Sequence, residues 1–260
     1  MKIRVLASGS KGNSIYVETF SAKVLIDCGI SFKKICEKLN STKNTLNLDA
    51  CLITHEHIDH INGLNVFVKN TNSIIYCSKG TKEAINIKNT NLLNSSNCCV
   101  IKNLESIYIN NLKITPFLVS HDAKEPFGYI LEEDNVKAVF LTDSGYVDRK
   151  YYDLLKNANV YYFESNHDVE MLINSDRPYY LKQRILSDLG HLSNIDSAIN
   201  FINICGEKTK KLILAHLSEE CNTCDCVLNT YKEIFEEHNF STDVEMYIAH
   251  QHEILEVICD

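Results

Sequence analysis

The sequence predicts an α/β protein built as a four-layer αβ/βα sandwich, and three observations support this class. Short apolar runs typical of strands alternate with amphipathic runs typical of helices. The alternation occurs in two similar halves, and ionisable residues follow strands in both of them. At 260 residues, the chain is long enough for one domain with a substantial core. We therefore expect a single domain over residues 1–260, with a site along one edge of its sheets.

The first half of the chain is expected to contain most of the strands. Each predicted strand is a short apolar run, and each predicted helix is a run with apolar residues on one face. The first strand begins almost at once, in Met-Lys-Ile-Arg-Val-Leu-Ala. The expected strands lie near residues 2–7, 13–20, 22–27, 49–54, 73–77, 98–102, 106–109, 112–119 and 127–133. The expected helices lie near residues 31–39, 60–70 and 79–87.

The second half is expected to be richer in helices. Its strands are predicted near residues 136–142, 159–163 and 211–215, with a final pair near 243–258. Its helices are predicted near residues 148–156, 167–173, 178–187, 194–204 and 224–237. No linker or low-complexity segment interrupts this pattern, and the chain has only three prolines.

The composition is that of an ordinary soluble protein, with 45% apolar and 23% charged residues. No apolar run approaches the length of a membrane span, and the opening strand does not resemble a secretory signal. We therefore expect a cytoplasmic protein whose eleven cysteines are mostly reduced thiols. One cluster, Cys221, Cys224 and Cys226, lacks an obvious fourth metal ligand, and its role is left open.

A short polar string at residues 54–64 is the strongest functional signal. It reads Thr-His-Glu-His-Ile-Asp-His-Ile-Asn-Gly-Leu and follows an apolar strand. Its potential metal ligands are His55, His57, Asp59 and His60. Imidazole and carboxylate groups suit zinc, manganese or iron. A surface loop would explain any one of these histidines, but neither a helical nor a strand period requires the whole pattern. The string therefore predicts a metal site.

The string resembles the signature of the metallo-β-lactamase superfamily, and downstream residues match the other positions of that signature. His121, Asp143 and His216 each follow an apolar strand, as the resemblance requires. The resemblance implies a metallo-β-lactamase fold with two divalent metal ions. The first metal would be held by His55, His57, His121 and Asp143. The second metal would be held by Asp59, His60, Asp143 and His216.

Asp27 matches the first motif of the superfamily, at the end of the strand Val-Leu-Ile-Asp-Cys-Gly. The resemblance implies that its carboxylate orients the histidine loop through hydrogen bonds. The alternative is that Asp27 caps the helix expected to begin near Ser31. We favour the orienting role because the other motifs of the superfamily are present.

Two further segments indicate phosphodiester chemistry within this superfamily. The loop at residues 8–14, Ser-Gly-Ser-Lys-Gly-Asn-Ser, offers backbone and side-chain donors to an anion. Glu164 and His191 resemble a glutamate and a downstream histidine of tRNA-processing nucleases. This resemblance implies that His191 contacts the phosphate or protonates the leaving oxygen, and that Glu164 orients His191. His167 competes for that role. The expected substrate-binding residues are Ser8, Ser10, Lys11, Asn13 and Asn194.

Taken together, the motifs resemble the bacterial YycJ/WalJ (VicX) group over nearly the whole chain. The group is cytoplasmic and encoded with a cell-wall two-component system. The resemblance implies 5′-to-3′ exonuclease activity on double-stranded DNA and a role in mismatch repair, and it disfavours a secreted antibiotic-degrading enzyme. One departure is Cys221, where the pattern of the group has asparagine.

The substrate is the least determined part of the prediction. In the expected reaction, Asp59 or Asp143 accepts a proton from the attacking water. The net charge is −8, opposite to the basic balance common in nucleic-acid-binding proteins. Lys11, Lys124, Lys182 and Arg184 could still form a local positive groove. The alternatives are a hydrolase of a small phosphodiester or ester, and a non-catalytic regulatory or ligand-binding protein. The oligomeric state is left open.

Overall fold

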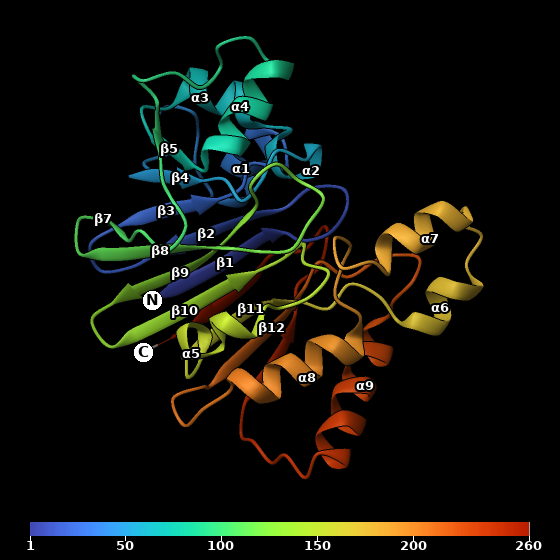
Figure 1. Cartoon of the computed structure of the whole chain (residues 1–260). Helices are drawn as coiled ribbons and strands as arrows, with labels where there is room; N and C mark the ends of the chain where they lie inside the picture. The colour runs from blue at the N-terminus through green and yellow to red at the C-terminus, as the bar shows by residue number, and fades with distance from the viewer. Residues whose placement is uncertain (260) are drawn as a thin grey trace. The chain divides into compact units, whose positions relative to one another are not determined.

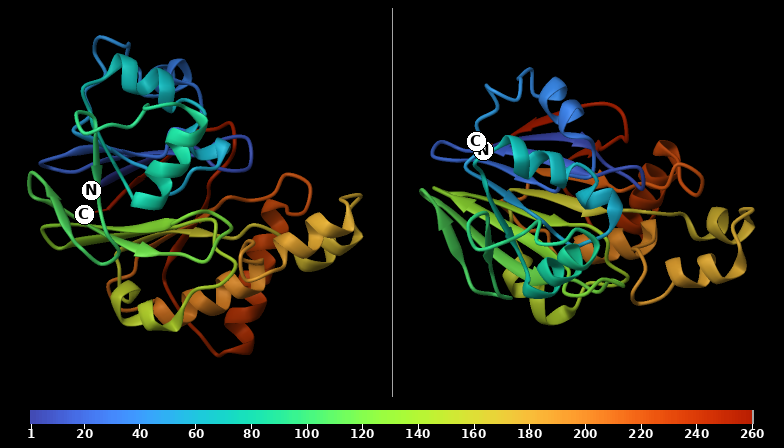
Figure 2. Two further views of the ribbon diagram at one scale, coloured as in Figure 1. Left: turned by 45° about the horizontal axis from the view of Figure 1, so that its top comes forward. Right: turned by 90° about the horizontal axis from the view of Figure 1, so that it is seen from above.

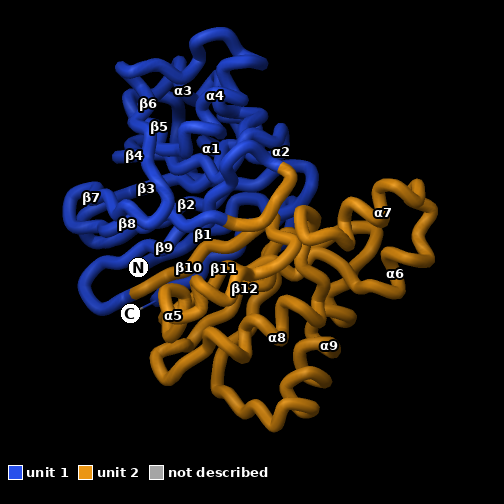
Figure 3. Tube along the Cα trace, viewed as in Figure 1, with its two compact units in different colours: residues 1–118, 123–136, 250–260 blue, residues 119–122, 137–249 orange. Residues whose placement is uncertain are grey.

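The computed structural model describes residues 1–259, which divide into two compact units (Figure 3). Of these residues, unit 1 comprises 1–118, 123–136 and 250–259, and unit 2 comprises 119–122 and 137–249. Both units combine strands with helices (Figure 1), so the predicted α/β class is confirmed. The single domain expected over residues 1–260 stays a prediction.

Unit 1 contains a mixed seven-stranded sheet in the order β14-β1-β2-β3-β4-β5-β6. Its strands are β1 Lys2–Ala7, β2 Ser14–Glu18, β3 Lys23–Ile26, β4 Ala50–Leu52, β5 Ile74–Cys77, β6 Cys98–Val100 and β14 Leu255–Ile258. The strands from β14 to β3 pair antiparallel, and those from β3 to β6 pair parallel. Strands β1, β3 and β4 therefore run in the same direction, and their carboxyl ends meet at one edge of the sheet. The loop at residues 8–13, Asp27 and the string at residues 54–64 all begin at this edge.

Among residues 1–259, unit 1 also contains an antiparallel meander and four helices. The meander consists of β7 Ile107–Ile109, β8 Leu112–Leu118 and β9 Phe127–Glu133. The helices are α1 Phe32–Lys38, α2 Ile58–Ile61, α3 Leu64–Asn70 and α4 Lys79–Lys88. Leu25, Ile35, Cys51 and Phe67 belong to a buried apolar cluster that joins helices to the sheet. This packing holds the carboxyl edge of the sheet in place.

Unit 2 is built on four parallel strands, β10 Val136–Leu141, β11 Val160–Glu164, β12 Lys211–Ala215 and β13 Glu245–Ile248. Every residue of β11 is buried, as is typical of a strand covered on both faces. Because the strands are parallel, Asp143, Glu164 and His216 lie at the same edge, where β10, β11 and β12 end.

Several helices of unit 2 begin at side-chain caps. Its helical segments are η1 Arg149–Tyr151, α5 Tyr152–Leu155, α6 Val169–Asn174, α7 Tyr179–Ile185, α8 Asn194–Ile204 and α9 Cys224–Glu237. The side chains of Asp168, Ser193 and Thr223 each accept a hydrogen bond from the backbone N–H three residues later. Within unit 2, α6 and α7 form a pair that stands apart from α8 and α9 (Figures 1 and 2).

The helix predicted over residues 60–70 is two helices, α2 and α3, and the difference has a local cause. The carbonyl of Asp59 accepts a hydrogen bond from the backbone N–H of Asn13, and the N–H of Gly63 donates to the carbonyl of Cys28. These bonds remove two groups from the i→i−4 ladder. A Cβ at Gly63 would also lie 2.1 Å from the carbonyl oxygen of Ile30, so only glycine fits there. The break therefore follows from contacts that are distant in sequence.

One other prediction differs in detail. The helix expected over residues 148–156 is a 3-10 turn followed by the single-turn helix α5. The final pair of strands lies within the predicted range, and its members pair with different strands, β13 with β12 and β14 with β1. None of the helices in residues 1–259 is long and apolar enough to cross a membrane.

Candidate metal centre

Asp27 is the centre of a buried hydrogen-bond network in unit 1. Its Oδ1 accepts the backbone N–H of Thr54 at 2.8 Å, and its Oδ2 accepts the Thr54 hydroxyl at 2.8 Å. The same Oδ2 lies 2.7 Å from Nδ1 of His60. The helix cap considered for Asp27 is instead supplied by Ser31, whose hydroxyl accepts from the backbone N–H of Lys34. Asp27 therefore orients the string at residues 54–64.

Asn13 holds the other side of the His60 ring. Its amide orientation is set by Gly9, whose N–H donates to Oδ1 and whose carbonyl accepts from Nδ2. The Nδ2 group lies 3.1 Å from Nε2 of His60 and 3.4 Å from Oδ2 of Asp59. Asn13, predicted to bind substrate, is thus in contact with two predicted metal ligands.

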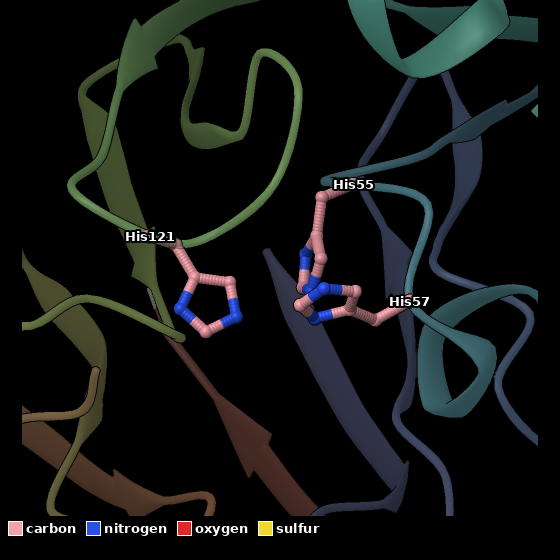
Figure 4. A group of neighbouring side chains, drawn as sticks. All are labelled: His55, His57 and His121. Carbon is pink, nitrogen blue, oxygen red and sulfur yellow. The ribbon is translucent and has the colours of Figure 1, made fainter. Parts of the chain in front are cut away.

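His55 and His57 lie in the loop between β4 and α2, and His121 lies in the loop after β8 (Figure 4). The centroids of the His55 and His57 rings are 4.6 Å apart, with an interplanar angle of 79°. The Nδ1 atom of His55 lies 3.0 Å from the Thr54 hydroxyl. His57 is half-buried and begins α2, whereas His55 is buried. Thr54, which was not predicted as a site residue, is therefore shared by Asp27, His55 and His60.

Three residues at strand ends adopt a left-handed backbone, with φ of 61° at Asp27, 54° at Asp143 and 54° at His216. This conformation is uncommon outside glycine and costs on the order of 1–3 kcal/mol per residue. It persists only where surrounding contacts impose it, and such residues concentrate at functional sites. The backbone N–H of Asp27 donates to the carbonyl of Leu52, and the carbonyl of His216 accepts from Nδ2 of Asn166.

Glu164 has the corresponding central position in unit 2. Its Oε1 lies 2.7 Å from Nδ1 of His191 and 3.1 Å from Nδ1 of His216. Its Oε2 accepts the backbone N–H of Ser144 at 2.7 Å. The carboxylate is fully buried, which opposes ionisation, but the attraction and hydrogen bonds of the two imidazoles leave its pKa below the usual value. Glu164 is thus an ionised group that orients both histidines.

His121 and Asp143 complete the polar cluster of unit 2. Nδ1 of His121 lies 3.1 Å from the carbonyl oxygen of Gly190, and its Nε2 lies 4.0 Å from Oδ1 of Asp143. Oδ1 of Asp143 is also 3.4 Å from Nδ1 of His216. Asp143 and His216 also belong to a group that could hold a metal, together with Glu164 and His191, because the ligand atoms of these four residues lie within 4.8 Å of one another.

The donor chemistry of both units fits divalent metal ions. In each unit, the Nδ1 atoms of predicted histidine ligands contact an oxygen acceptor: a carboxylate, a carbonyl or a hydroxyl. These contacts are His55 with Thr54, His60 with Asp27, His121 with Gly190, and His216 with Glu164. An imidazole that donates its Nδ1 proton directs the Nε2 lone pair to a metal, and such a partner also makes the ring more basic. The clusters are therefore suited to divalent metals.

The predicted substrate loop is anchored by the last residues of unit 1. The backbone N–H of Lys11 donates to Oε1 of Gln251, and Nε2 of Gln251 donates to the carbonyl of Gly12. Ser8 is buried, whereas Ser10 and Lys11 are exposed at the surface. The substrate roles of these residues stay predictions.

Asn194 lies in the interior of unit 2. Its Oδ1 accepts from Ser165 and from Asn222, and its Nδ2 donates to Asn222 at 3.0 Å. The substrate contact predicted for Asn194 stays a prediction, and the burial and bonding of the amide favour a structural role. The cysteines near it form no disulfide within residues 1–259, and Cys221 packs in an apolar cluster with Leu172 and Ile185.

His167 was considered as an alternative to His191, and the structure separates the two. His191 is 14% exposed and is bonded to Glu164. His167 is 1% exposed, and neither of its ring nitrogens has a hydrogen-bond partner among the described residues. Burial lowers the pKa of His167 to about 4, so the ring is neutral at pH 7. Of the two, His191 is the ring that combines exposure with an orienting carboxylate.

Comparison with known proteins identifies several relatives. A family model described as "Beta-lactamase superfamily domain" matches residues 22–217. The chain is 43% identical to the exodeoxyribonuclease WalJ of Streptococcus pneumoniae over 85% of this chain and 83% of that protein. It is 36% identical to the exodeoxyribonuclease YycJ of Bacillus anthracis over 91% of this chain and 89% of that protein.

The fold is also shared with solved structures. The metallo-β-lactamase fold protein YhfI from Bacillus subtilis superposes with a TM-score of 0.72, at 17% identity, over 98% of this chain and 99% of that one. Likeness at this level of identity shows the fold alone, and it confirms the predicted α/β sandwich.

Proposed function

Because the chain belongs to the WalJ/YycJ family of the β-lactamase superfamily, we propose that it is a dinuclear metal-dependent nuclease. Its proposed reaction is 5′-to-3′ exonucleolytic cleavage of double-stranded DNA, in DNA repair. We place this activity in the cytoplasm. The names of the relatives support a deoxyribonucleotide substrate, and the side-chain network of each unit supports the metal.

The observation that carries the proposal is that Nδ1 of each of four histidines contacts an oxygen acceptor, and that these histidines come from three separate segments of the chain. Asp27 and Glu164 each hold the Nδ1 of a predicted ligand histidine while buried. Carboxylate–histidine pairs of this kind fix the tautomer in which Nε2 binds a metal. A cluster of surface histidines would not need buried carboxylates behind it.

We assign seven side chains to the two metals. The first metal would be held by His55, His57, His121 and Asp143. The second would be held by Asp59, His60, Asp143 and His216. Imidazole and carboxylate ligands are compatible with zinc and manganese, and also with iron. When bound, two such ions supply Lewis-acid stabilisation of the phosphate and lower the pKa of water.

The other side chains position protons. Nδ1 of His191 is engaged by Glu164, so its Nε2 is the atom that faces the substrate when it donates a proton to the phosphate or leaving oxygen. Asp59 is half-exposed and Asp143 is buried, and either carboxylate could accept the proton of the attacking water. Burial opposes ionisation of Glu164, but the attraction and hydrogen bonds of the two imidazoles hold its pKa below the usual value.

Substrate turnover by metal-loaded protein tests the proposal directly. Apo-protein is supplied with manganese or zinc and given 5′-labelled duplex DNA, single-stranded DNA, RNA and bis(4-nitrophenyl) phosphate. We expect duplex DNA to be degraded to nucleotides from the 5′ end. Turnover of the small diester alone would favour the small-phosphodiester alternative, and no turnover of any substrate would favour a non-catalytic regulatory protein.

A further inference from the structure

We propose that helix α7 binds unpaired nucleotides at the end of a DNA substrate, with Tyr179 and Tyr180 as its stacking surface. This inference rests on the proposed nuclease function and concerns how that nuclease holds the end of its substrate. Both rings are 73% exposed, although aromatic side chains of this size are usually at least partly covered. They lie side by side in the sequence, at the first two positions of the helix.

One face of helix α7 packs against the interior of unit 2, and another face is exposed to solvent. Ile185 belongs to a small buried cluster with Leu172 and Cys221, and Leu181 packs against that cluster. Residues 181 and 185 are one helical turn apart, so they define the inner face. Tyr179 and Tyr180 point away from it, as their exposure shows. The inner cluster holds the helix without either tyrosine.

The chemistry of the outer face matches unpaired DNA. The sequence of α7 has two cations and no acidic residue, in a chain with a net charge of −8. Since Arg184 is paired with Asp122, Lys182 is the cation of the helix that remains for a phosphate. Nζ of Lys182 donates to the carbonyls of Ile173 and Ser175, so no carboxylate neutralises it there. Aromatic rings with nearby cations bind single-stranded nucleic acid, because every base can stack on a ring while its phosphate meets the charge. Paired bases are already stacked, so the unpaired end is the matching part of the substrate.

The position of Tyr179 is itself held by the helix. Nε2 of Gln183 donates to the hydroxyl of Tyr179 at 2.8 Å, one turn along the helix. A ring that is held in this way loses less conformational entropy when a base stacks on it.

Helix α7 and the segment that follows it are both bonded to the loop that carries His121. Arg184 forms a two-pronged ion pair with Asp122, at 2.6 and 2.9 Å. The Ser120 hydroxyl donates to the carbonyl of Asp188, and the carbonyl of Gly190 accepts from Nδ1 of His121. A nucleotide held on α7 would therefore be held by the element that also supports a proposed metal ligand. This continuity favours DNA over an unrelated partner.

The test is a binding measurement that does not depend on catalysis. Metal-free protein in EDTA is titrated into two labelled duplexes, one with a short 5′ thymidine overhang and one with blunt ends, and fluorescence anisotropy gives Kd. We expect Tyr179→Ala and Tyr180→Ala each to raise Kd for the overhang duplex by about tenfold, the scale of one base–aromatic stack. The blunt duplex should change much less.

Matched variants separate stacking from general damage. Tyr179→Phe and Tyr180→Phe keep the ring and should bind almost as the wild type does. Tyr108→Ala removes a ring that is 66% exposed on β7 of unit 1 and should leave both Kd values unchanged. Circular dichroism of each variant checks that the fold is retained.

Three outcomes would overturn the proposal. Unchanged overhang binding in the double variant Y179A/Y180A would show that the rings do not contact DNA. Equal losses on overhang and blunt duplexes would show that unpaired nucleotides are not the occupant. A dimeric wild type and a monomeric double variant in sedimentation would make the face an interface between two copies. If the wild type binds the overhang duplex but cleaves no DNA with metal, the proposed function fails while this inference stands.

Discussion

Oδ2 of Asp27 and Nδ1 of His60 are 2.7 Å apart, in side chains that are 2% and 0% exposed. The contact joins the end of β3 to α2, and it decides which nitrogen of His60 is available to a metal. Its counterpart in unit 2 is the contact of Glu164 with His216.

Asp27→Asn is therefore expected to lower metal affinity by about 10- to 100-fold, because an amide stabilises the ligand tautomer less than a carboxylate does. Competition between the protein and a zinc chelator measures the affinity. Asp134→Asn in an exposed turn is the matched control, since asparagine also tolerates its φ of 52°. Equal affinity in both variants would count against the orienting role of Asp27.

His57→Ala and Asp59→Ala are expected to abolish metal-dependent hydrolysis while the fold is retained. Both side chains are half-buried at the edge of the sheet, so their truncation leaves no large cavity. Turnover and circular dichroism of the purified variants are the measurements. His238→Ala, an exposed histidine at the end of α9, should retain full activity. Retained turnover in either test variant would refute the ligand assignment.

His191→Ala is expected to leave metal content unchanged and to reduce turnover by about two to three orders of magnitude, the scale of general-acid catalysis. The reason is that Nδ1 of His191 is already engaged by Glu164. Elemental analysis of the purified variant, alongside kcat, separates the two roles. Loss of metal would instead make His191 a ligand, as the cluster of Asp143, Glu164, His191 and His216 allows.

His167 should make the protein less stable in mild acid. Burial lowers its folded-state pKa from 6.5 to about 4, so the unfolded chain binds the proton first as the pH falls. The contribution of the neutral His167 ring to the free energy of unfolding is fully present above pH 6.5. It is lost as the pH falls towards 4, by about 3 kcal/mol at 1.36 kcal/mol per pH unit. Urea unfolding of wild type and His167→Gln across this range measures the difference. Parallel pH profiles would contradict it.

Binding of DNA should weaken steeply as salt increases, whereas hydrolysis of a small phosphodiester should not. Contacts with phosphates release counterions, so log K falls linearly with log salt concentration. The net charge of −8 makes the slope informative, because only local cations can produce it. Anisotropy titrations from 50 to 200 mM salt, roughly the range in which such binding changes, provide the measurement. A flat profile would support the small-substrate alternative.

Much of the architecture could be predicted because it depends on local patterns. The apolar run of β11 and the helical pattern of α8 are visible in the sequence, and both elements occur close to where they are expected. The break between α2 and α3 could not be predicted, since it depends on bonds from Asn13 and Cys28 to the helical residues. The separation of β13 from β14 was equally invisible, because strand partners are chosen by packing.

For the site, the sequence by itself determined the chemical groups and their positions after strands, because donor type and strand ends are local properties. Only the tertiary structure decided which acceptor holds which ring. Asp27 and His60 are 33 residues apart, and Glu164 and His216 are 52 apart. Parallel strands bring their carboxyl ends to one edge of the sheet. A carboxylate buried there must be paired to offset its loss of water, and in both units the partner is an imidazole. Thr54, shared among Asp27, His55 and His60, emerged only from that pairing.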